Sequence, residues 1–187
     1  LAPELAGYRR ALHARPELAF HEHVTSDFVA QKLTQWDIPH HRGLGGTGIV
    51  AWVDGRARNK GRTIGIRGDM DALPIAEASG QDWTSIHAGC MHACGHDGHT
   101  IMVLGTAKYL HDHPDFNGRV YFIFQPAEES GGGAQKMIHD GLFEKFQIDE
   151  VYAVHNAPYA PVGMFGSRAG PIMAATDDVH ITLQGRG

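Results

Sequence analysis

The chain has 187 residues, which is enough for one well-formed core and the start of a second domain. Its apolar fraction of 42% is typical of a globular protein and argues against a disordered one. Twenty-one acidic and sixteen basic residues give a formal net charge of −5 without a basic stripe, so we expect no nucleic-acid partner. No apolar run approaches the roughly 20 residues of a membrane span, so we expect no membrane partner either.

Two helices and two strands are predicted in the first third of the chain. Apolar residues recur near helical spacing over Glu4–His13 and Glu22–Trp36. Compact apolar runs follow over Gly48–Val53 and Thr63–Arg67, and the turn-rich segment between them is long enough for a hairpin loop. We therefore interpret these two runs as neighbouring strands.

Helices and strands alternate in the remainder of the chain. We predict a helix over His99–Leu110, a strand over Val120–Phe124, a helix over Gly132–Ile138 and a buried strand over Val151–Val154. Such alternation indicates an α/β fold with a central, mostly parallel (mixed) sheet covered by helices on both faces. The long stretch Ile75–Gly89 is predicted to be an irregular loop over a site.

The nine residues from position 91 carry the densest chemistry, with the sequence Met-His-Ala-Cys-Gly-His-Asp-Gly-His. Borderline divalent ions such as zinc, manganese or cobalt bind thiolate, imidazole and carboxylate groups. Cys94 and His96 are two residues apart, so both can face one ion while Gly95 supplies the bend. The alternative interpretation is a solvated histidine-rich loop.

A pair of neighbouring carboxylates, Glu128 and Glu129, follows the strand predicted over Val120–Phe124. Neighbouring side chains of an extended segment point differently, so one glutamate can bind metal while the other remains free as a base. The sequence does not say which is which. A divalent ion lowers the pKa of its bound water from about 15.7 toward about 7, so a free glutamate could take a proton from that water and the hydroxide could attack an amide. An exposed turn is the alternative.

Further candidate ligands stand at the ends of two other predicted strands. Asp69 and Asp71 lie on the same side of an extended segment, where they could hold a ligand histidine or the ion itself, and a solvated turn is the alternative. His155 follows the last predicted strand. The carboxyl ends of parallel strands collect reactive groups at one edge of the sheet, so we expect all these side chains to converge.

The remaining histidines and cysteines have simpler interpretations. Asp97 and His99 are interpreted as groups that orient the ligands. Cys90 and Cys94 are four residues apart, a spacing that disfavours a structural disulfide in a chain of this size, so we expect free thiols in a reducing, cytoplasmic setting. Most of the other histidines are expected at the surface: His13, His21, His23, His40, His41, His87, His111, His113, His139 and His180.

Four ordered motifs resemble the amidohydrolase branch of the zinc-dependent aminoacylase and carboxypeptidase family. Members of this branch include hippurate hydrolases, indole-acetyl-amino acid hydrolases and N-acetyldiaminopimelate deacetylases. The resemblance runs from about Leu12 to Gly187. The motifs that carry it are Gly68–Pro74, Met91–His99, Phe124–Glu129 and Val154–Pro158.

This resemblance implies a di-metal, exopeptidase-like catalytic domain that uses two divalent ions of zinc, manganese, cobalt or nickel. The metal ligands that it implies are Cys94, His96, Glu129 and His155. It makes Glu128 the general base and acid, which activates a metal-bound water, and Asp71 a supporting catalytic group. The implied reaction is hydrolysis of the amide bond of small N-acyl amino acids, such as hippurate, to a free acid and an amino acid.

The resemblance also predicts a truncated domain organisation. Residues 1–176 correspond to the N-terminal part of the metal-dependent catalytic domain. Residues 177–187 correspond to the first strand of a lid and dimerisation domain, with residues 177–183 alternating as in an edge strand. In the family, the remainder of the lid and one more ligand histidine follow, and homo-oligomers form through the lid.

Two other functions remain compatible with the sequence. One is a metallo-aminopeptidase or carboxypeptidase of the same superfamily, against which the Cys94-Gly95-His96 motif argues. The other is a non-catalytic metal-binding fragment in which Cys94 serves sensing or structure. A hydrolase keeps a free glutamate beside an open coordination position, whereas a structural site closes its coordination shell.

Overall fold

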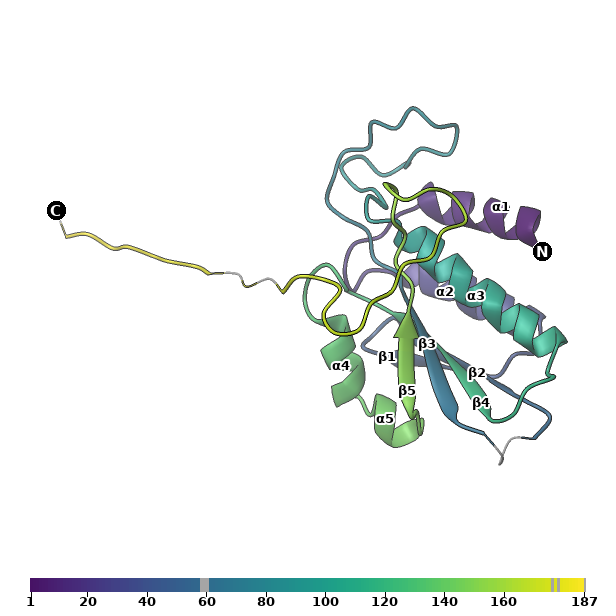
Figure 1. Cartoon of the computed structure of the whole chain (residues 1–187). Helices are drawn as coiled ribbons and strands as arrows, with labels where there is room; N and C mark the ends of the chain where they lie inside the picture. Colours follow the sequence, from purple (N-terminus) through teal and green to yellow (C-terminus); the bar gives the residue numbers. More distant parts are fainter. Residues whose placement is uncertain (58–60, 176, 178, 187) are drawn as a thin grey trace. The chain divides into compact units, whose positions relative to one another are not determined.

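A five-stranded mixed sheet lies at the centre of the unit formed by Leu1–Asn156 (Figure 1). The computed structural model describes residues 1–57, 61–175, 177 and 179–186. The strand order across the sheet is β1-β2-β4-β3-β5. The strands are β1 (His40–Leu44), β2 (Gly48–Asp54), β3 (Thr63–Asp69), β4 (Arg119–Gln125) and β5 (Glu150–Ala153).

The pairing of the strands divides the sheet into a parallel and an antiparallel part. Strand β3 is parallel to both β4 and β5, whereas β2 is antiparallel to both β1 and β4. The predicted hairpin between Gly48–Val53 and Thr63–Arg67 is wrong, because β4 lies between β2 and β3. Strand β4 is buried along all of its length after Arg119. Its two edges are paired with β2 and β3, and helices cover its two faces.

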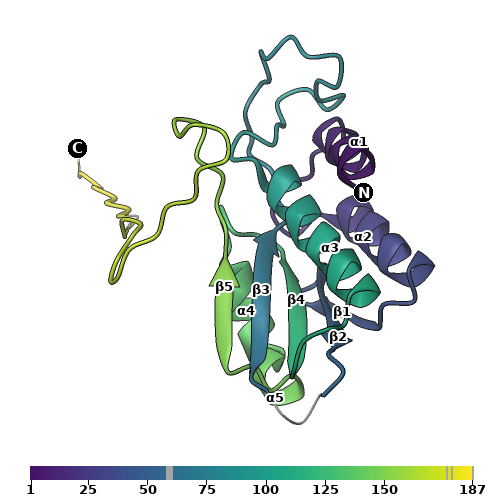
Figure 2. The same cartoon turned by 45° about the vertical axis from the view of Figure 1, so that its right-hand side comes forward.

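Helices cover both faces of this sheet, as predicted (Figures 1 and 2). The first face carries α1 (Ala2–His13), α2 (His23–Gln35) and α3 (His96–Asp112), and the other carries α4 (Gly133–His139) and α5 (Leu142–Lys145). Alternate residues of β2 and β4 enter two separate cores. Phe122 packs in the core under α1–α3, whereas its neighbours Tyr121 and Ile123 pack against α4 and α5.

Helix α3 begins three residues earlier than predicted, at His96 instead of His99. Gly95 takes the N-cap position with a φ of +88°, in the left-handed region that favours glycine. A Cβ at this position would lie 2.7 Å from Nδ2 of Asn156. The bend predicted at Gly95 is therefore present, and it places His96 in the first turn of the helix.

Two local expectations need correction or stay open, and two short elements were not expected. The strand predicted as buried is exposed, with Val151 46% and Tyr152 54% accessible, because β5 pairs with β3 alone among the described strands. Strand β1 and helix α5 were not predicted. In the second unit, Ala157–Gly187, no strand is assigned to the described residues of 177–187, while 178 and 187 lie outside the described residues. The lid assignment of this segment remains a prediction.

None of the helices in the described ranges is both long enough and apolar enough to cross a membrane.

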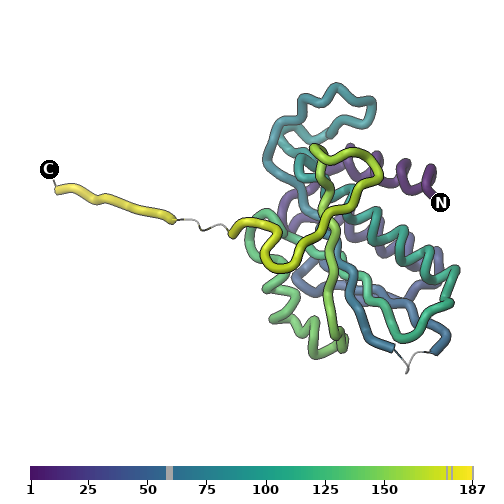
Figure 3. Tube along the Cα trace, viewed as in Figure 1, coloured from purple at the N-terminus to yellow at the C-terminus, as the bar shows by residue number. Residues whose placement is uncertain are grey.

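The long segment after β3, residues 70–95, extends beyond the carboxyl ends of the parallel strands (Figure 3). Within it, Ile75–Gly89 contains no helix or strand, as predicted.

Truncation of the central core residue should cost more stability than truncation of a surface phenylalanine. Phe122 is fully buried, so we expect Phe122→Ala to lower the free energy of unfolding by about 3–5 kcal/mol. Phe143 on α5 is 42% exposed, and Phe143→Ala should cost about 1 kcal/mol. Equilibrium unfolding in urea compares the two variants, and equal losses would contradict the assigned core.

Candidate metal centre

The carboxyl ends of β3, β4 and β5 lie at one edge of the sheet, as their parallel arrangement requires (Figure 2). Asp71, the Glu128-Glu129 pair and His155 follow these three ends, and α3 starts beside them with His96. The convergence predicted from the order of strands and ligands is therefore present.

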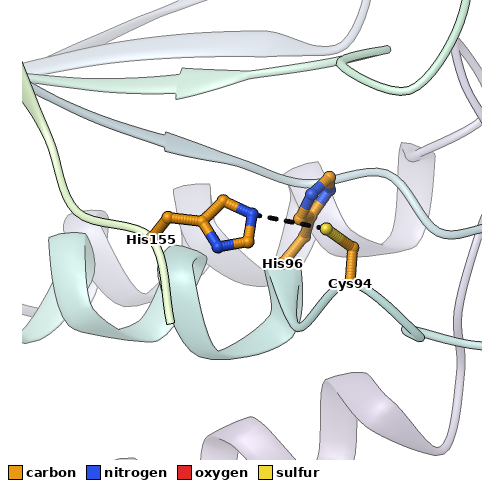
Figure 4. Close-up of side chains that lie close together, drawn as sticks. All are labelled: Cys94, His96 and His155. Carbon is orange, nitrogen blue, oxygen red and sulfur yellow. Dashed lines mark hydrogen bonds between the residues drawn. The ribbon is translucent and has the colours of Figure 1, made fainter. Parts of the chain in front are cut away.

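Among the residues that the structure describes, three overlapping groups of side chains place potential ligand atoms within 4.8 Å of one another. The groups are Cys94, His96 and His155; Asp69, His96 and His99; and His96, Glu128 and Glu129. His96 belongs to all three. In the first group, Cys94 Sγ lies 3.4 Å from Nε2 of His155, with His96 beside them (Figure 4).

The imidazole of His96 has one satisfied and one unsatisfied nitrogen. Its Nδ1 lies 3.2 Å from Oδ1 of Asp71, whereas its Nε2 is buried without a hydrogen-bond partner. Nε2 faces Oε1 of Glu129 at 3.6 Å and Oε2 of Glu128 at 3.9 Å. With Nδ1–H donated to Asp71, the lone pair on Nε2 points at the carboxylates. This arrangement fits a metal ligand held by a carboxylate behind it.

Asp71 connects His96 to the segment that carries the two glutamates. Its Oδ2 accepts a hydrogen bond of 3.0 Å from the backbone N–H of Glu129. Burial acts to raise the pKa of Asp71, but hydrogen bonds from His96 and from the backbone of Glu129 and Glu128 outweigh burial and lower it. The ionised carboxylate of Asp71 thus positions both the imidazole ring of His96 and the backbone of Glu129, two residues that could bind metal.

Asp69 is engaged by two other side chains. Its Oδ1 lies 2.7 Å from Nδ1 of His99, and its Oδ2 lies 2.7 Å from Nη1 of Arg67. Burial acts to raise the pKa of Asp69, but these partners lower it to about 2. His99 Nε2 in turn accepts the backbone N–H of Asn156 at 3.0 Å, next to His155. Of the two roles left open for Asp69, its contacts favour holding a histidine.

Negative charge accumulates around the thiol of Cys94. Burial, a hydrogen bond with Glu129 and the charges of Glu129, Asp69 and Glu128 raise the pKa of Cys94 to about 12. Burial acts to lower the pKa of His96, but Asp71 and the nearby carboxylates outweigh it and raise that pKa. A divalent cation would neutralise this environment and stabilise the thiolate, so the donor set fits a metal. Both cysteines are free thiols, as predicted.

Asp97 faces helix α1 and not the cluster of potential ligands. Its Oδ2 lies 2.7 Å from Nε of Arg9 and 2.8 Å from Nδ1 of His13. The Nε2 atom of His13 lies 3.1 Å from Oε1 of Glu77, so His13 connects the Ile75–Gly89 loop to Asp97. The expectation of a surface position is therefore wrong for His13, which is 5% exposed because it lies between two carboxylates.

The buried carboxylate of Glu22 was not predicted from the sequence. Its Oε1 accepts the backbone N–H groups of Phe20 at 3.0 Å and Ala127 at 2.8 Å, and its Oε2 accepts the hydroxyl of Thr47 at 2.6 Å. Ala127 has a φ of +49° and directly precedes Glu128. An acidic residue at a helix start ordinarily faces solvent near the helix dipole, so no sequence signal marked this role.

Residues 65–186 match the protein family described as Peptidase family M20/M25/M40. The chain belongs to this family. The resemblance carried by the four motifs is thereby confirmed.

Named relatives and a solved structure agree with this membership. The chain is 43% identical to the hippurate hydrolase of Campylobacter jejuni, covering 100% of this chain and 48% of the relative. It is 42% identical to the N-acetyl-L-cysteine deacetylase of Bacillus subtilis, covering 100% of this chain and 44% of that protein. A crystal structure of a dinuclear metal-binding M20 peptidase from Bacillus subtilis superposes with a TM-score of 0.79 at 39% identity, over 86% of this chain and 45% of the other. The chain spans about half the length of the curated relatives it matches.

Removal of the Glu22 carboxylate should destabilise the segment before the glutamate pair. Glu22→Ala leaves three donors unpaired, and we expect it to lower the free energy of unfolding by about 3 kcal/mol. Glu22→Gln keeps an oxygen for the two backbone donors and offers an N–H to Thr47, so it should cost about 1 kcal/mol. Urea denaturation compares the variants, and equal costs would show that the oxygen retained in glutamine contributes nothing.

Glu77 should make stability depend on pH in the acidic range. Burial acts to raise its pKa, but hydrogen bonds from Ser79, the Ser85 backbone and His13 lower it from 4.5 to about 2. This stabilisation is present above the unfolded-state pKa and is lost as pH falls through the folded-state pKa. The stability difference between wild type and Glu77→Gln should therefore shrink between about pH 5 and about pH 2. Thermal melts across this range test it, and parallel curves would contradict it.

Proposed function

We propose that the parent protein of this chain is a metal-dependent amidohydrolase that cleaves the amide bond of N-acyl amino acids. The observation that carries this proposal is the unpartnered, buried Nε2 of His96, which faces two glutamates within 4 Å. The names of the hippurate hydrolase and deacetylase relatives support the same bond and the same class of substrate.

The groups that would hold metal are Cys94, His96, Glu129 and His155. They contribute one thiolate, two imidazoles and one carboxylate, a set accepted by zinc and also by manganese, cobalt or nickel. The similarity to a dinuclear metal-binding peptidase supports two ions. When bound, the ions would polarise the amide carbonyl and lower the pKa of a nearby water.

Glu128 would transfer the proton in this reaction. Its side chain is 41% exposed, against 23% for Glu129, whose backbone is held by Asp71. The more accessible carboxylate can accept a proton from water as the water oxygen bonds to the carbonyl carbon. As the C–N bond breaks, Glu128 returns that proton to the leaving nitrogen, which yields a free acid and an amino acid.

Asp71 would act through its neighbours. Its two oxygens hold the His96 ring and the Glu129 backbone, so it fixes two groups of the site in relation to each other. A carboxylate behind a histidine also increases the basicity of the opposite ring nitrogen.

Replacement of Glu128 should separate metal binding from hydrolysis. In the full-length parent protein, purified without chelator and assayed with added manganese or zinc, Glu128→Gln should retain metal and lose about 10²–10⁴-fold in kcat for hippurate and N-acetyl amino acids. The exposed Glu144 on α5 provides a matched control, since Glu144→Gln should retain both properties. Mass spectrometry measures the metal content.

Other outcomes would favour the alternative functions. Metal binding by the wild type without turnover of any substrate would indicate a binding module. Faster cleavage of unblocked dipeptides than of N-acyl amino acids would indicate a peptidase. Equal activity after complete removal of metal would contradict a metal-dependent reaction.

A further inference from the structure

A cavity of about 480 Å³ opens among three segments at the carboxyl edge of the sheet. Its volume lies within the usual range of small-molecule sites, roughly 300–1,000 Å³. Most of its wall is apolar and comes from the segment between α1 and α2 and from the residues after β3. Its lining includes Leu18, Ala19, Ala72, Leu73, Pro74 and Glu129.

Backbone hydrogen bonds hold two sides of this cavity in place. Leu18 forms a parallel bridge with Ala72, whose N–H donates to the carbonyl of Glu17 at 2.8 Å. Leu73 and Met91 exchange two hydrogen bonds of 3.0 Å. The residues after β3 are thus fixed between two extended segments, so a ligand would enter a largely preformed wall.

The cavity adjoins the groups assigned to the reaction. Glu129 forms part of its wall and lies 3.6 Å from Nε2 of His96. Ala72 directly follows Asp71, which binds the backbone of Glu129. A group seated in the cavity can therefore be continuous with an amide placed at His96 and Glu128.

The charges that line the cavity determine whether the acyl half or the amino acid half of an N-acyl amino acid can occupy it. Within the described part of the chain, the lining residues include the carboxylate of Glu129 but no lysine or arginine. His21 and Ser130 complete the lining, and both side chains belong to exposed residues. The carboxylate of the amino acid half would meet no fixed cation there, whereas an uncharged acyl group would bury apolar surface.

We propose that this cavity is the acyl subsite and that it favours apolar acyl groups larger than acetyl, such as benzoyl. The proposal rests on the proposed hydrolysis of N-acyl amino acids and adds a choice of substrate and the residues that make it. Leu18 is the specificity residue, because it lines the cavity and its backbone is bridged to that of Ala72, which lines the cavity beside it.

The test uses the full-length parent protein with Leu18→Trp, which adds bulk at the cavity wall, and Leu18→Ala, which removes apolar contact without adding bulk. For each variant the ratio of kcat/KM for N-benzoylglycine over N-acetylglycine should fall at least about 10-fold. Ile138 on α4 is 43% exposed and does not line the cavity, against 38% exposure for Leu18. Ile138→Trp is therefore a matched control and should leave the ratio unchanged.

A binding measurement separates this proposal from the proposed function. Titration calorimetry with benzoate should give an affinity about 10-fold weaker in the Leu18 variants. Affinity that depends on Leu18, in a wild type that hydrolyses no N-acyl amino acid, would support the apolar subsite and contradict the proposed function. An unchanged ratio together with unchanged benzoate affinity would overturn the subsite. The subsite would also be overturned if the Leu18 variants changed only the preference for the amino acid half of the substrate. Comparing kcat/KM for N-benzoylglycine and N-benzoylleucine measures that preference.

Discussion

The carboxylate of Asp71 is the constraint on which the geometry of the site depends. One oxygen holds the ring of His96 at the start of α3, and the other holds the backbone of Glu129 after β4. Three segments that are distant in sequence are therefore joined by a single ionised group at the end of β3. Because the Asp71 contact occupies Nδ1 of His96, the opposite nitrogen is left facing the glutamates.

Further buried charges brace the segments around this centre. Glu22 holds the strained backbone at Ala127, and Asp97 connects the first turn of α3 to Arg9 and His13 on α1. Removing one partner from such a contact costs more free energy of unfolding than the pair contributes, because the remaining buried group is left without a hydrogen-bond partner and cannot reach water. The functional edge of the sheet is consequently held by polar contacts, while the two apolar cores hold the rest of the unit.

Local patterns in the sequence were sufficient for most helices and strands and for the clustering of the site, because each depends on periodicity or on the order of strand ends. Strand pairing depends on contacts across the chain, so the hairpin between Gly48–Val53 and Thr63–Arg67 was wrongly expected and β4 takes the place between them. Glu22 and His13 were missed for the same reason. Their partners Ala127 and Asp97 lie 105 and 84 residues away, beyond any local pattern.

The missing side chain at Gly95 allows a close approach within the site. Cys94 and His155 come from segments 61 residues apart, and between Cys94 and His96 the chain passes so close to the side chain of Asn156 that a Cβ on Gly95 would lie 2.7 Å from its Nδ2. A single methyl group at position 95 would act as a wedge between these two segments. The close approach of the thiol and the imidazole is thus compatible with glycine at a position that contributes no atom to either of them.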